Sequence, residues 1–193
     1  MLFRIINKIK YKLLLSQIKP EIIGYQDAKG TTIHETGASN MSHISNKKNV
    51  FIGEHVFIGH FNYIDGYRKI VIEEGCQITN YVSILTHSSH HSIRLHGNKT
   101  LPENLAEEGL LADEVYIGKY SYIGAHSVIM PGTKIGKGSI VSAFSYVNGE
   151  FPDYSILRGQ PAKVIGSTKD IDTGFLAEFP ELECFYYDTC QNQ

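Results

Sequence analysis

Four histidines are clustered in the middle of the 193-residue chain: His87, His90, His91 and His96. A neutral imidazole accepts a proton near neutral pH, so histidine suits the role of a general base toward a hydroxyl group. The surrounding segment, LTHSSHHSIRLHGNKTLPENLAEEGLLADE, also contains Arg94 and the acidic pair Glu107–Glu108. A long segment with its own polar groups is typical of a functional loop. Such a loop needs a rigid frame on each side.

That frame is visible as a repeat of six residues on the C-terminal side of the loop. Branched aliphatic residues recur at the positions Ile117, Ile123, Ile129, Ile135, Val141 and Val147. Glycine often follows the aliphatic residue, and a small or hydroxylated residue stands four positions after it. A period of six fits neither an α-helix nor a simple hairpin array, but it fits a solenoid with a turn after every short strand.

The repeat also precedes the loop, with one irregularity. The aliphatic positions are Ile52, Ile58, Ile64 and Ile70, then, after a shift of two residues, Ile72, Ile78 and Ile84. Cys76 occupies a fourth position of this pattern, which predicts a small buried side chain with no reactive role. Three hexads predict one triangular coil, with the aliphatic residues stacked inside the prism.

Residues 30–166 resemble the hexapeptide-repeat acyltransferases, as in VYIGKYSYIGAHSVIMPGTKIGKGSIVSAFSYV and the closing QPAKVIG. Within that family the layout is similar to sugar and xenobiotic O-acetyltransferases of the galactoside and maltose acetyltransferase type. The resemblance implies an all-β solenoid, a left-handed parallel β-helix with an inserted loop at about residues 86–113. General crossover rules alone favour a right hand. It also implies acetyl-CoA as the donor substrate, no required metal, and a homotrimer with active sites between protomers.

The position of His87, directly after the last regular hexad of the first block, matches the place of the catalytic histidine in the resembling enzymes. We therefore expect His87 to be the general base that deprotonates an acceptor hydroxyl. His90 or His91 could instead reach that place from the loop, or line an acceptor pocket. The resemblance also places acceptor contacts near Asn62, Tyr63 and Asp65.

The second repeat block is expected to form the donor groove. Gly124–Ala125 and Ser142–Ala143 match positions where small residues of the family contact the pantetheine arm, and a backbone amide near Ala125 could stabilise the thioester oxygen. Lys163 matches a basic position that binds the phosphates of coenzyme A. Arg158 and Lys137 are weaker candidates. Asn148–Gly149 replaces a Thr-Lys pair common in the family, so the contacts at the nucleotide end remain open.

The two ends of the chain differ in charge. Residues 1–20 contain five basic residues and no acid, whereas residues 170–193 contain six acids and no base. Apolar residues near helical spacing predict an amphipathic basic helix in residues 1–29. It either caps the solenoid or packs on a neighbouring protomer, or it contacts an anionic membrane surface. Residues 167–193 are expected to form an acidic cap. We expect these ends to attract each other or different partners.

Composition narrows the class of protein. A net charge of −2 gives no reason to expect nucleic-acid binding, and no apolar run approaches the roughly 20 residues needed to cross a bilayer. The three cysteines match no zinc pattern and indicate free thiols in a reducing compartment. We expect a cytoplasmic protein, with possible contact to the inner face of the membrane through residues 1–20.

Other functions share this pattern. An N-acetyltransferase acting on an amino sugar, or an antibiotic acetyltransferase, would use the same fold and the same histidine. A metalloenzyme similar to the γ-class carbonic anhydrases would need His55, His60 and His87 to converge on zinc. A solenoid used only as a scaffold would lack coenzyme A binding.

Overall fold

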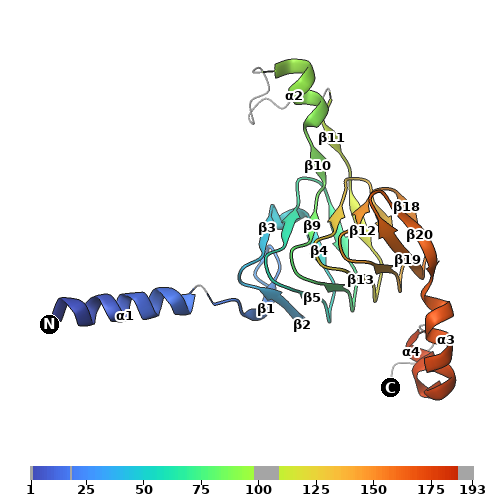
Figure 1. The fold of residues 1–193 in the computed structure, drawn as a ribbon, viewed down its shortest axis with the longest axis horizontal. Helices are drawn as coiled ribbons and strands as arrows, with labels where there is room; N and C mark the ends of the chain where they lie inside the picture. The colour runs from blue at the N-terminus through green and yellow to red at the C-terminus, as the bar shows by residue number, and fades with distance from the viewer. Residues whose placement is uncertain (1, 18, 98–108, 187–193) are drawn as a thin grey trace.

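The computed structural model describes residues 2–17, 19–97 and 109–186, and its central part is a three-sided solenoid (Figure 1). Sheet 1 contains, in spatial order, β1 (Ile22–Gln26), β2 (Thr32–Ser39), β5 (Phe57–Ile58), β8 (Gln77–Ile78), β13 (Tyr122–Ile123), β16 (Ile140–Val141), β19 (Ser155–Gly159) and β20 (Ala162–Ser167). Sheet 2 contains β3 (His43–Ser45), β6 (Tyr63–Asp65), β9 (Ser83–Ile84), β14 (Val128–Ile129) and β17 (Tyr146–Val147). Sheet 3 contains β4 (Val50–Ile52), β7 (Ile70–Ile72), β12 (Val115–Ile117), β15 (Lys134–Ile135) and β18 (Glu150–Phe151).

Successive strands pass from sheet 3 to sheet 1 to sheet 2, so each coil uses one strand of each sheet. The strands within a sheet are parallel and in register, as when Ile84 pairs with Ile64 on one side and its strand partner Ile129 on the other. Antiparallel pairs close the two ends of sheet 1, β1 with β2 and β19 with β20. The architecture is therefore the parallel β-helix that the six-residue period predicts.

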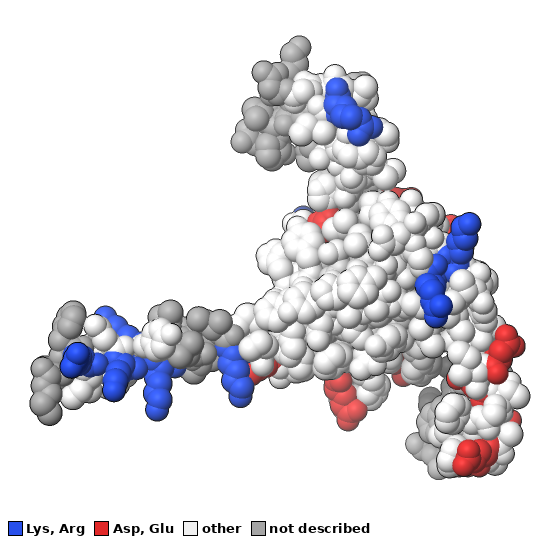
Figure 2. All heavy atoms as spheres, in the orientation of Figure 1, with Lys and Arg blue, Asp and Glu red and all other residues white. Residues whose placement is uncertain are grey.

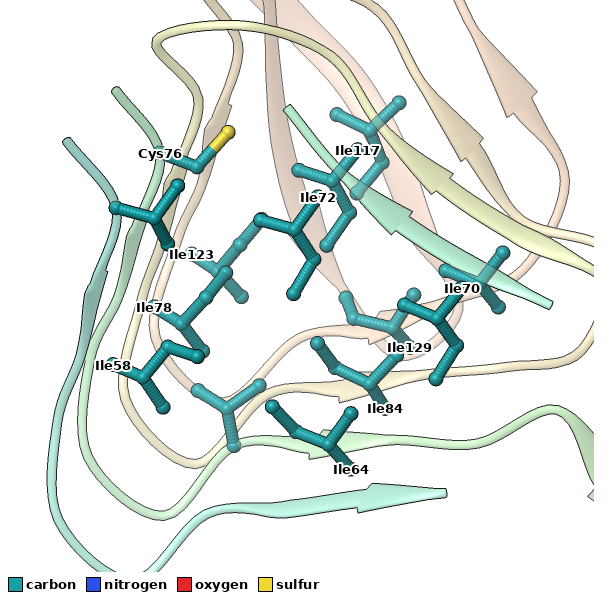
Figure 3. Packing of buried hydrophobic residues seen from close by; sticks show 14 of the residues in the cluster. Ile58, Ile64, Ile70, Ile72, Cys76, Ile78, Ile84, Ile117, Ile123 and Ile129 are labelled. Carbon is teal, nitrogen blue, oxygen red and sulfur yellow. The ribbon is translucent and has the colours of Figure 1, made fainter. Parts of the chain in front are cut away.

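The core is a column of branched aliphatic side chains inside the prism (Figure 3). Every aliphatic hexad position named above is buried, and most have no exposed surface. The shift of two residues places both Ile70 and Ile72 in β7, and both point inward. Burial of about 0.8 kcal/mol per methylene, repeated along the column, makes this core the main source of stability. Cys76 also lies in the core, as predicted.

Buried hydroxyl groups connect neighbouring coils and explain the small residue at the fourth position. Ser127 donates to the carbonyl of Ser142 and accepts from the amide of Ser145, at 3.1 and 3.3 Å. Ser121 makes the equivalent pair of bonds to Gly136 and Ser139. A hydroxyl both donates and accepts, so one side chain satisfies two backbone groups that the turns leave unpaired.

The expectation of three free thiols is wrong for Cys184. Cys76 is free and buried, whereas Cys184 is disulfide-bonded. Cysteine count and spacing do not show which side chains approach each other in the fold, which is why the sequence could not separate the two. The reducing compartment inferred from free thiols therefore has no support from Cys184.

Helices lie at both ends of the solenoid. α1 (Leu2–Gln17) projects away from the coils, whereas α3 (Thr168–Glu178) and α4 (Glu183–Tyr186), joined by a 3₁₀ turn at Pro180–Leu182, lie at the opposite end (Figure 1). Thr168 of α3 is buried and donates to the carbonyl of Gly138. A second 3₁₀ turn spans Lys47–Asn49. Within the described residues, no helix is both long and apolar enough to cross a bilayer.

Candidate active site

His87 lies where the inserted loop leaves the solenoid. It begins β10 (His87–Ser88), which pairs antiparallel with β11 (Leu111–Ala112) as the stem of an arm that carries α2 (His90–His96) at its tip (Figure 1). The coil below fixes the stem, because the amide of Leu85 donates to the carbonyl of Ile129 at 2.9 Å. The backbone of His87 is therefore held by the adjoining coil, and one third of its side chain is exposed.

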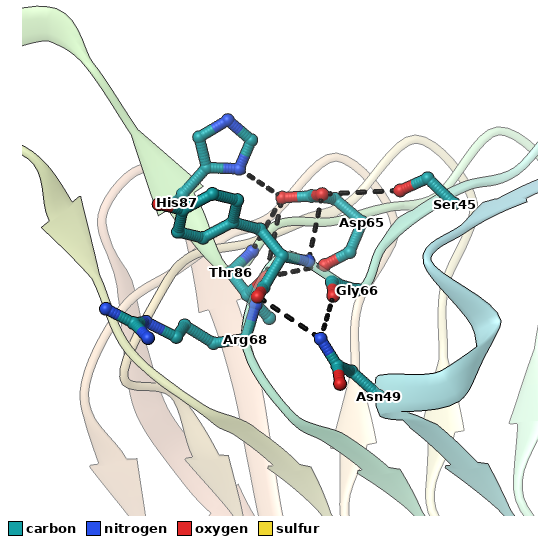
Figure 4. A network of polar contacts seen from close by, with 8 residues as sticks. Ser45, Asn49, Asp65, Gly66, Arg68, Thr86 and His87 are labelled. Carbon is teal, nitrogen blue, oxygen red and sulfur yellow. Dashed lines mark hydrogen bonds and ion pairs between the residues drawn. The ribbon is translucent and has the colours of Figure 1, made fainter. Parts of the chain in front are cut away.

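The imidazole of His87 contacts a buried carboxylate. Its Nδ1 lies 2.5 Å from Oδ2 of Asp65, at the end of β6 on the preceding coil (Figure 4). Asp65 is almost completely buried. A carboxylate oxygen can only accept, so Nδ1 carries the proton in this hydrogen bond and Nε2 is left to accept another. A base held in one tautomer by a carboxylate is the arrangement used in histidine-based catalysis.

Neighbouring groups hold the Asp65 carboxylate in place. Its Oδ1 accepts from the hydroxyl of Ser45 at 3.3 Å and from the amide of Tyr67 at 3.2 Å. The amide of Thr86 donates to the carboxylate Oδ2 at 3.4 Å, and the hydroxyl of Thr86 donates to the backbone carbonyl of Asp65 at 2.6 Å. These donors stabilise the ionised carboxylate inside the protein, where an unpaired charge would be costly.

Tyr67 and Arg68 extend the site, and the sequence analysis did not single them out. The ring of Tyr67 lies 4.7 Å from that of His87, and the guanidinium of Arg68 lies 5.5 Å from the Tyr67 ring. Both residues occupy the turn between β6 and β7, where the two-residue shift adds length. The two-residue shift was the sequence signal that could have pointed to Tyr67 and Arg68, because extra residues in a repeat produce a longer turn at the edge of the coil.

The residues expected to contact an acceptor have different surroundings. Asn62 is buried, donating to the carbonyl of Gly59 and accepting from the amide of Val82, so its amide group serves the coil. Tyr63 is exposed and stacks on His43, with ring centroids 5.6 Å apart. The carboxylate of Asp65 is buried and points toward His87, not toward solvent. The structure thus places these three side chains in three different environments.

His90 and His91 lie on α2, on the arm and away from the coils. Their rings are 4.1 Å apart, and Arg94 bonds to both residues. The pKa of His91 is lowered from its usual value, first by the neighbouring His90, next by desolvation and then by the charge of Arg94. Nearby positive charge and loss of solvent both disfavour the charged imidazolium. Glu107 and Glu108 lie outside the described residues.

The small residues expected to form the donor groove meet at the corner between sheets 1 and 2. The amide of Gly124 donates to Val141, and the amide of Phe144 donates to the carbonyl of Ala125. Gly124 packs so closely on the next coil that an added Cβ would lie 2.5 Å from the amide nitrogen of Ala143. The amides of Ala125 and Ala143 have no acceptor among the described residues. This corner therefore offers two backbone donors to a ligand.

Four aromatic rings stack along the same corner: Phe61, Tyr81, His126 and Phe144. Neighbouring ring centroids are 4.7 to 5.2 Å apart, and all four residues have φ near +60°. Bulky residues rarely adopt a positive φ, and such residues tend to gather at functional sites. The sequence analysis missed this stack, although the four rings occupy equivalent positions of the repeat.

The cationic candidates separate into two groups. Lys163 and Arg158 face each other as register partners in the β19–β20 pair, so two positive charges lie at the end of the solenoid. Lys137 lies at the corner between sheets 3 and 1, with its ammonium 5.7 Å from the ring of Tyr154. Lys163 and Arg158 can therefore contact one phosphate group together, whereas Lys137 lies at a different corner.

The three histidines of the zinc alternative do not come together. His60 pairs with the hydroxyl of Ser39 at 2.7 Å, and His87 pairs with Asp65. His55 lies 3.0 Å from Glu35. Across the described ranges, the group that could surround one metal ion is His34, Glu35 and His55, all of them exposed.

Comparisons with known proteins identify the same type of solenoid. Residues 114–149 match the family model described as bacterial transferase hexapeptide (six repeats). WbbJ, a putative lipopolysaccharide biosynthesis O-acetyl transferase of Escherichia coli, is 29% identical, covering 60% of this chain and 59% of the relative. The galactoside O-acetyltransferase of Escherichia coli is 30% identical, covering 64% and 57%. The chain thus spans less than two thirds of the length of both relatives.

A solved structure extends the comparison to the fold. A hexapeptide-repeat acetyltransferase of Vibrio cholerae superposes with a TM-score of 0.59 and 27% identity, covering 71% of this chain and 73% of that chain. The same enzyme has also been solved in complex with acetyl coenzyme A, with a TM-score of 0.58. These matches confirm the resemblance to hexapeptide-repeat acetyltransferases and the predicted left-handed parallel β-helix.

Proposed function

We propose that this protein is an acetyl-CoA-dependent O-acetyltransferase that uses His87 as its general base and acts on a hydroxyl of a carbohydrate. The observation that carries the proposal is the contact between His87 Nδ1 and the buried carboxylate of Asp65. This contact leaves Nε2 able to take a proton at a partly exposed position. It occurs on a solenoid whose similar proteins are acetyltransferases by name.

Acetyl-CoA is the proposed donor, bound along the corner between sheets 1 and 2. The amides of Ala125 and Ala143 supply donors to polar groups of the pantetheine arm and the thioester, and Gly124 lets the two coils that carry these amides pack closely. Lys163, with Arg158 opposite it, is suited to the phosphates. The acetyl-CoA complex of the Vibrio cholerae enzyme supports this choice of donor.

The reaction follows as a direct transfer. His87 Nε2 removes the proton of the acceptor hydroxyl while its oxygen forms a bond to the thioester carbonyl carbon. The carbonyl oxygen becomes an oxyanion that a backbone amide stabilises. Collapse of this tetrahedral intermediate breaks the carbon–sulfur bond, and the imidazolium returns the proton to the departing sulfur. Asp65 keeps the ring oriented through both proton transfers, acting as a positioning residue.

We propose a homotrimer, the assembly that the resemblance implies, and its support in the structure is that the two halves of the site lie on different sides of one coil. Tyr81 stands at the corner with the ring stack, and His87 follows six residues later, beyond sheet 2. Six extended residues span roughly 20 Å. A donor lying along that corner would reach His87 of an adjacent protomer if two solenoids pack side by side. The site is then complete only in the assembly.

A sugar of a surface polysaccharide or related glycan is the proposed acceptor. The described part of the site is polar and open, with Tyr67 and Arg68 beside His87. WbbJ is named for lipopolysaccharide biosynthesis and the galactoside enzyme for a galactoside, which supports a carbohydrate hydroxyl. An amino group remains the alternative acceptor, because the same base serves both.

A thermal-shift titration with acetyl-CoA tests the donor without knowledge of the acceptor. Ligand at about 100 times its dissociation constant should stabilise the native protein by roughly 2.7 kcal/mol. A saturable rise in melting temperature supports the proposal, and no rise at millimolar concentration argues against it. The acetylated product then separates the two chemistries, because an ester is cleaved by mild alkali and an amide is not.

A further inference from the structure

Helix α1 lies apart from the coils of the solenoid (Figure 1). It extends from the first coil without packing along the solenoid (Figure 1). Apolar side chains among its described residues are open to solvent, with exposures of 46% for Ile5, 42% for Ile6 and 54% for Ile9. The cap on the solenoid expected from the sequence is therefore not the arrangement that the structure adopts.

The residues of α1 are sorted by face. At 3.6 residues per turn, Ile5, Ile6, Ile9 and Leu13 fall within an arc of about 100°. Lys10 and Lys12 stand on the two flanks of that arc, and Arg4 and Lys8 continue the side next to Lys12. Figure 2 shows the basic side chains along the projecting helix. Lysines on the flanks of an apolar stripe can keep their ammonium groups in water while the stripe is buried.

An isolated helix of 16 residues is marginal in water, and amphipathic helices gain most of their stability from packing. Among the described side chains of α1, Ile5, Ile6 and Ile9 form an apolar stripe that the solenoid leaves exposed, so a partner outside the chain is expected. The charge identifies its chemistry. Residues 1–20 carry Arg4, Lys8, Lys10, Lys12 and Lys19 and no acidic residue.

We infer that α1 binds the surface of an anionic lipid bilayer, with its apolar stripe inserted at the headgroup boundary and its lysines among the lipid phosphates. Basic amphipathic helices with aliphatic residues on one face bind such surfaces in this way. Each Lys or Arg near the surface adds electrostatic attraction that falls off within a Debye length. The solenoid would then be held beside the bilayer, where a lipid-linked glycan is presented.

The acidic C-terminal helices are the main alternative partner, since α3 exposes Ile171 and Phe175 beside Asp170 and Asp172. In this chain α1 and α3 lie at opposite ends of the solenoid (Figure 1). Solenoids packed side by side and parallel keep those ends apart. Contact between α1 of one copy and α3 of the next would therefore run head to tail and build an open filament. The lipid surface requires no such assembly.

Flotation with vesicles tests the inference on the full-length protein. Vesicles of phosphatidylcholine alone are compared with vesicles containing about 30% phosphatidylglycerol. We expect the protein to float with the anionic vesicles, to stay behind with the neutral ones, and to be released at about 0.5 M salt. Lys8→Glu with Lys12→Glu should lower the partition coefficient at least tenfold, since two attractive charges become repulsive. Ile5→Ser with Ile9→Ser should lower it as well.

The matched control is Lys29→Glu with Lys48→Glu, two exposed lysines on the solenoid that carry the same change in net charge. This control should float like the wild type. Equal flotation of the wild type and both α1 variants would overturn the inference, as would no flotation with anionic vesicles. A further contrary result is a wild-type filament, detected by sedimentation, that the α1 variants dissolve. Acetyl-CoA binding in solution should be unchanged in every variant, so a failure here is separate from a failure of the proposed activity.

Discussion

Nδ1 of His87 and Oδ2 of Asp65 lie 2.5 Å apart, although the two residues are 22 positions apart in the chain. The stacking of coils creates this contact, because Ile64 and Ile84 are partners in neighbouring strands and their following residues are brought side by side. The buried carboxylate and the partly exposed imidazole then form one unit, and the first prediction concerns it.

Replacing Asp65 with Asn should lower the rate while leaving donor binding intact. Asparagine can present an N–H to Nδ1, so the imidazole is no longer held with its proton at Nδ1. We expect kcat for acetyl-CoA consumption to fall at least about 10²-fold, with little change in the KM for acetyl-CoA. Release of the CoA thiol measures this. Asp65→Glu retains an acceptor carboxylate and should recover part of the loss. Equal rates for wild type and Asp65→Asn would remove the orienting role.

Truncation of Ile84 should destabilise the solenoid. Ile84 has no exposed surface and stacks between Ile64 and Ile129 (Figure 3). Ile84→Ala leaves a cavity in a rigid column and is expected to cost about 2–5 kcal/mol in urea unfolding. Ile93→Ala, at a position 58% exposed, is the control and should change stability by less than about 0.5 kcal/mol. Similar losses for both would contradict the packed column.

Gly124 is predicted to be required for the spacing of two coils. An added Cβ would lie 2.5 Å from the amide nitrogen of Ala143 and 2.6 Å from the carbonyl oxygen of Val141, both backbone atoms that cannot turn aside. Gly124→Ala should therefore lower the melting temperature and weaken acetyl-CoA binding. Gly174→Ala is the control, since a Cβ there meets nothing within 4 Å inside α3. Alanine should be neutral or slightly stabilising at that position.

Cys76 should resist alkylation in the folded protein. Burial raises the pKa of its thiol to about 12. The reactive thiolate is therefore rarer at pH 8.5 than in an exposed cysteine. We expect iodoacetamide to modify Cys76 slowly in buffer and quickly in urea, as read by peptide mass spectrometry. The sign for stability follows: the neutral thiol favours the fold below pH 9, and this contribution is lost as pH rises toward 12. Rapid native labelling would contradict the burial.

The regular part of the fold could be predicted because each coil repeats one physical requirement. The interior accepts a branched aliphatic residue every sixth position, and Ile117, Ile123 and Ile129 satisfy it without exception. The buried hydroxyls follow the same period. The hand of the solenoid and the structure of its two ends could not be predicted in this way. A six-residue period does not indicate that α1 projects outward or that Cys184 is disulfide-bonded.

The site was partly predictable for the same reason. His87 could be identified at the edge of the repeat, whereas Asp65 was expected to contact an acceptor and in fact bonds to His87. The register that pairs Ile64 with Ile84 places Asp65 opposite Leu85, two residues before His87, so it brings Asp65 near His87 without showing that the two side chains meet. The position of Tyr67 beside His87 depends on the conformation of the longer turn between β6 and β7. The break in the period shows that this turn is longer but does not predict its conformation.

Acetyl transfer by wild type and His87→Ala tests the central claim most directly. Labelled acetyl-CoA is supplied with a panel of sugars, and donor binding to both proteins is measured by thermal shift. The account predicts that the wild type acetylates at least one sugar, while His87→Ala binds acetyl-CoA equally and transfers at least about 10²-fold more slowly. Equal transfer by the variant would contradict the role of His87, and donor binding without transfer to any hydroxyl or amine in the panel would contradict the proposed activity.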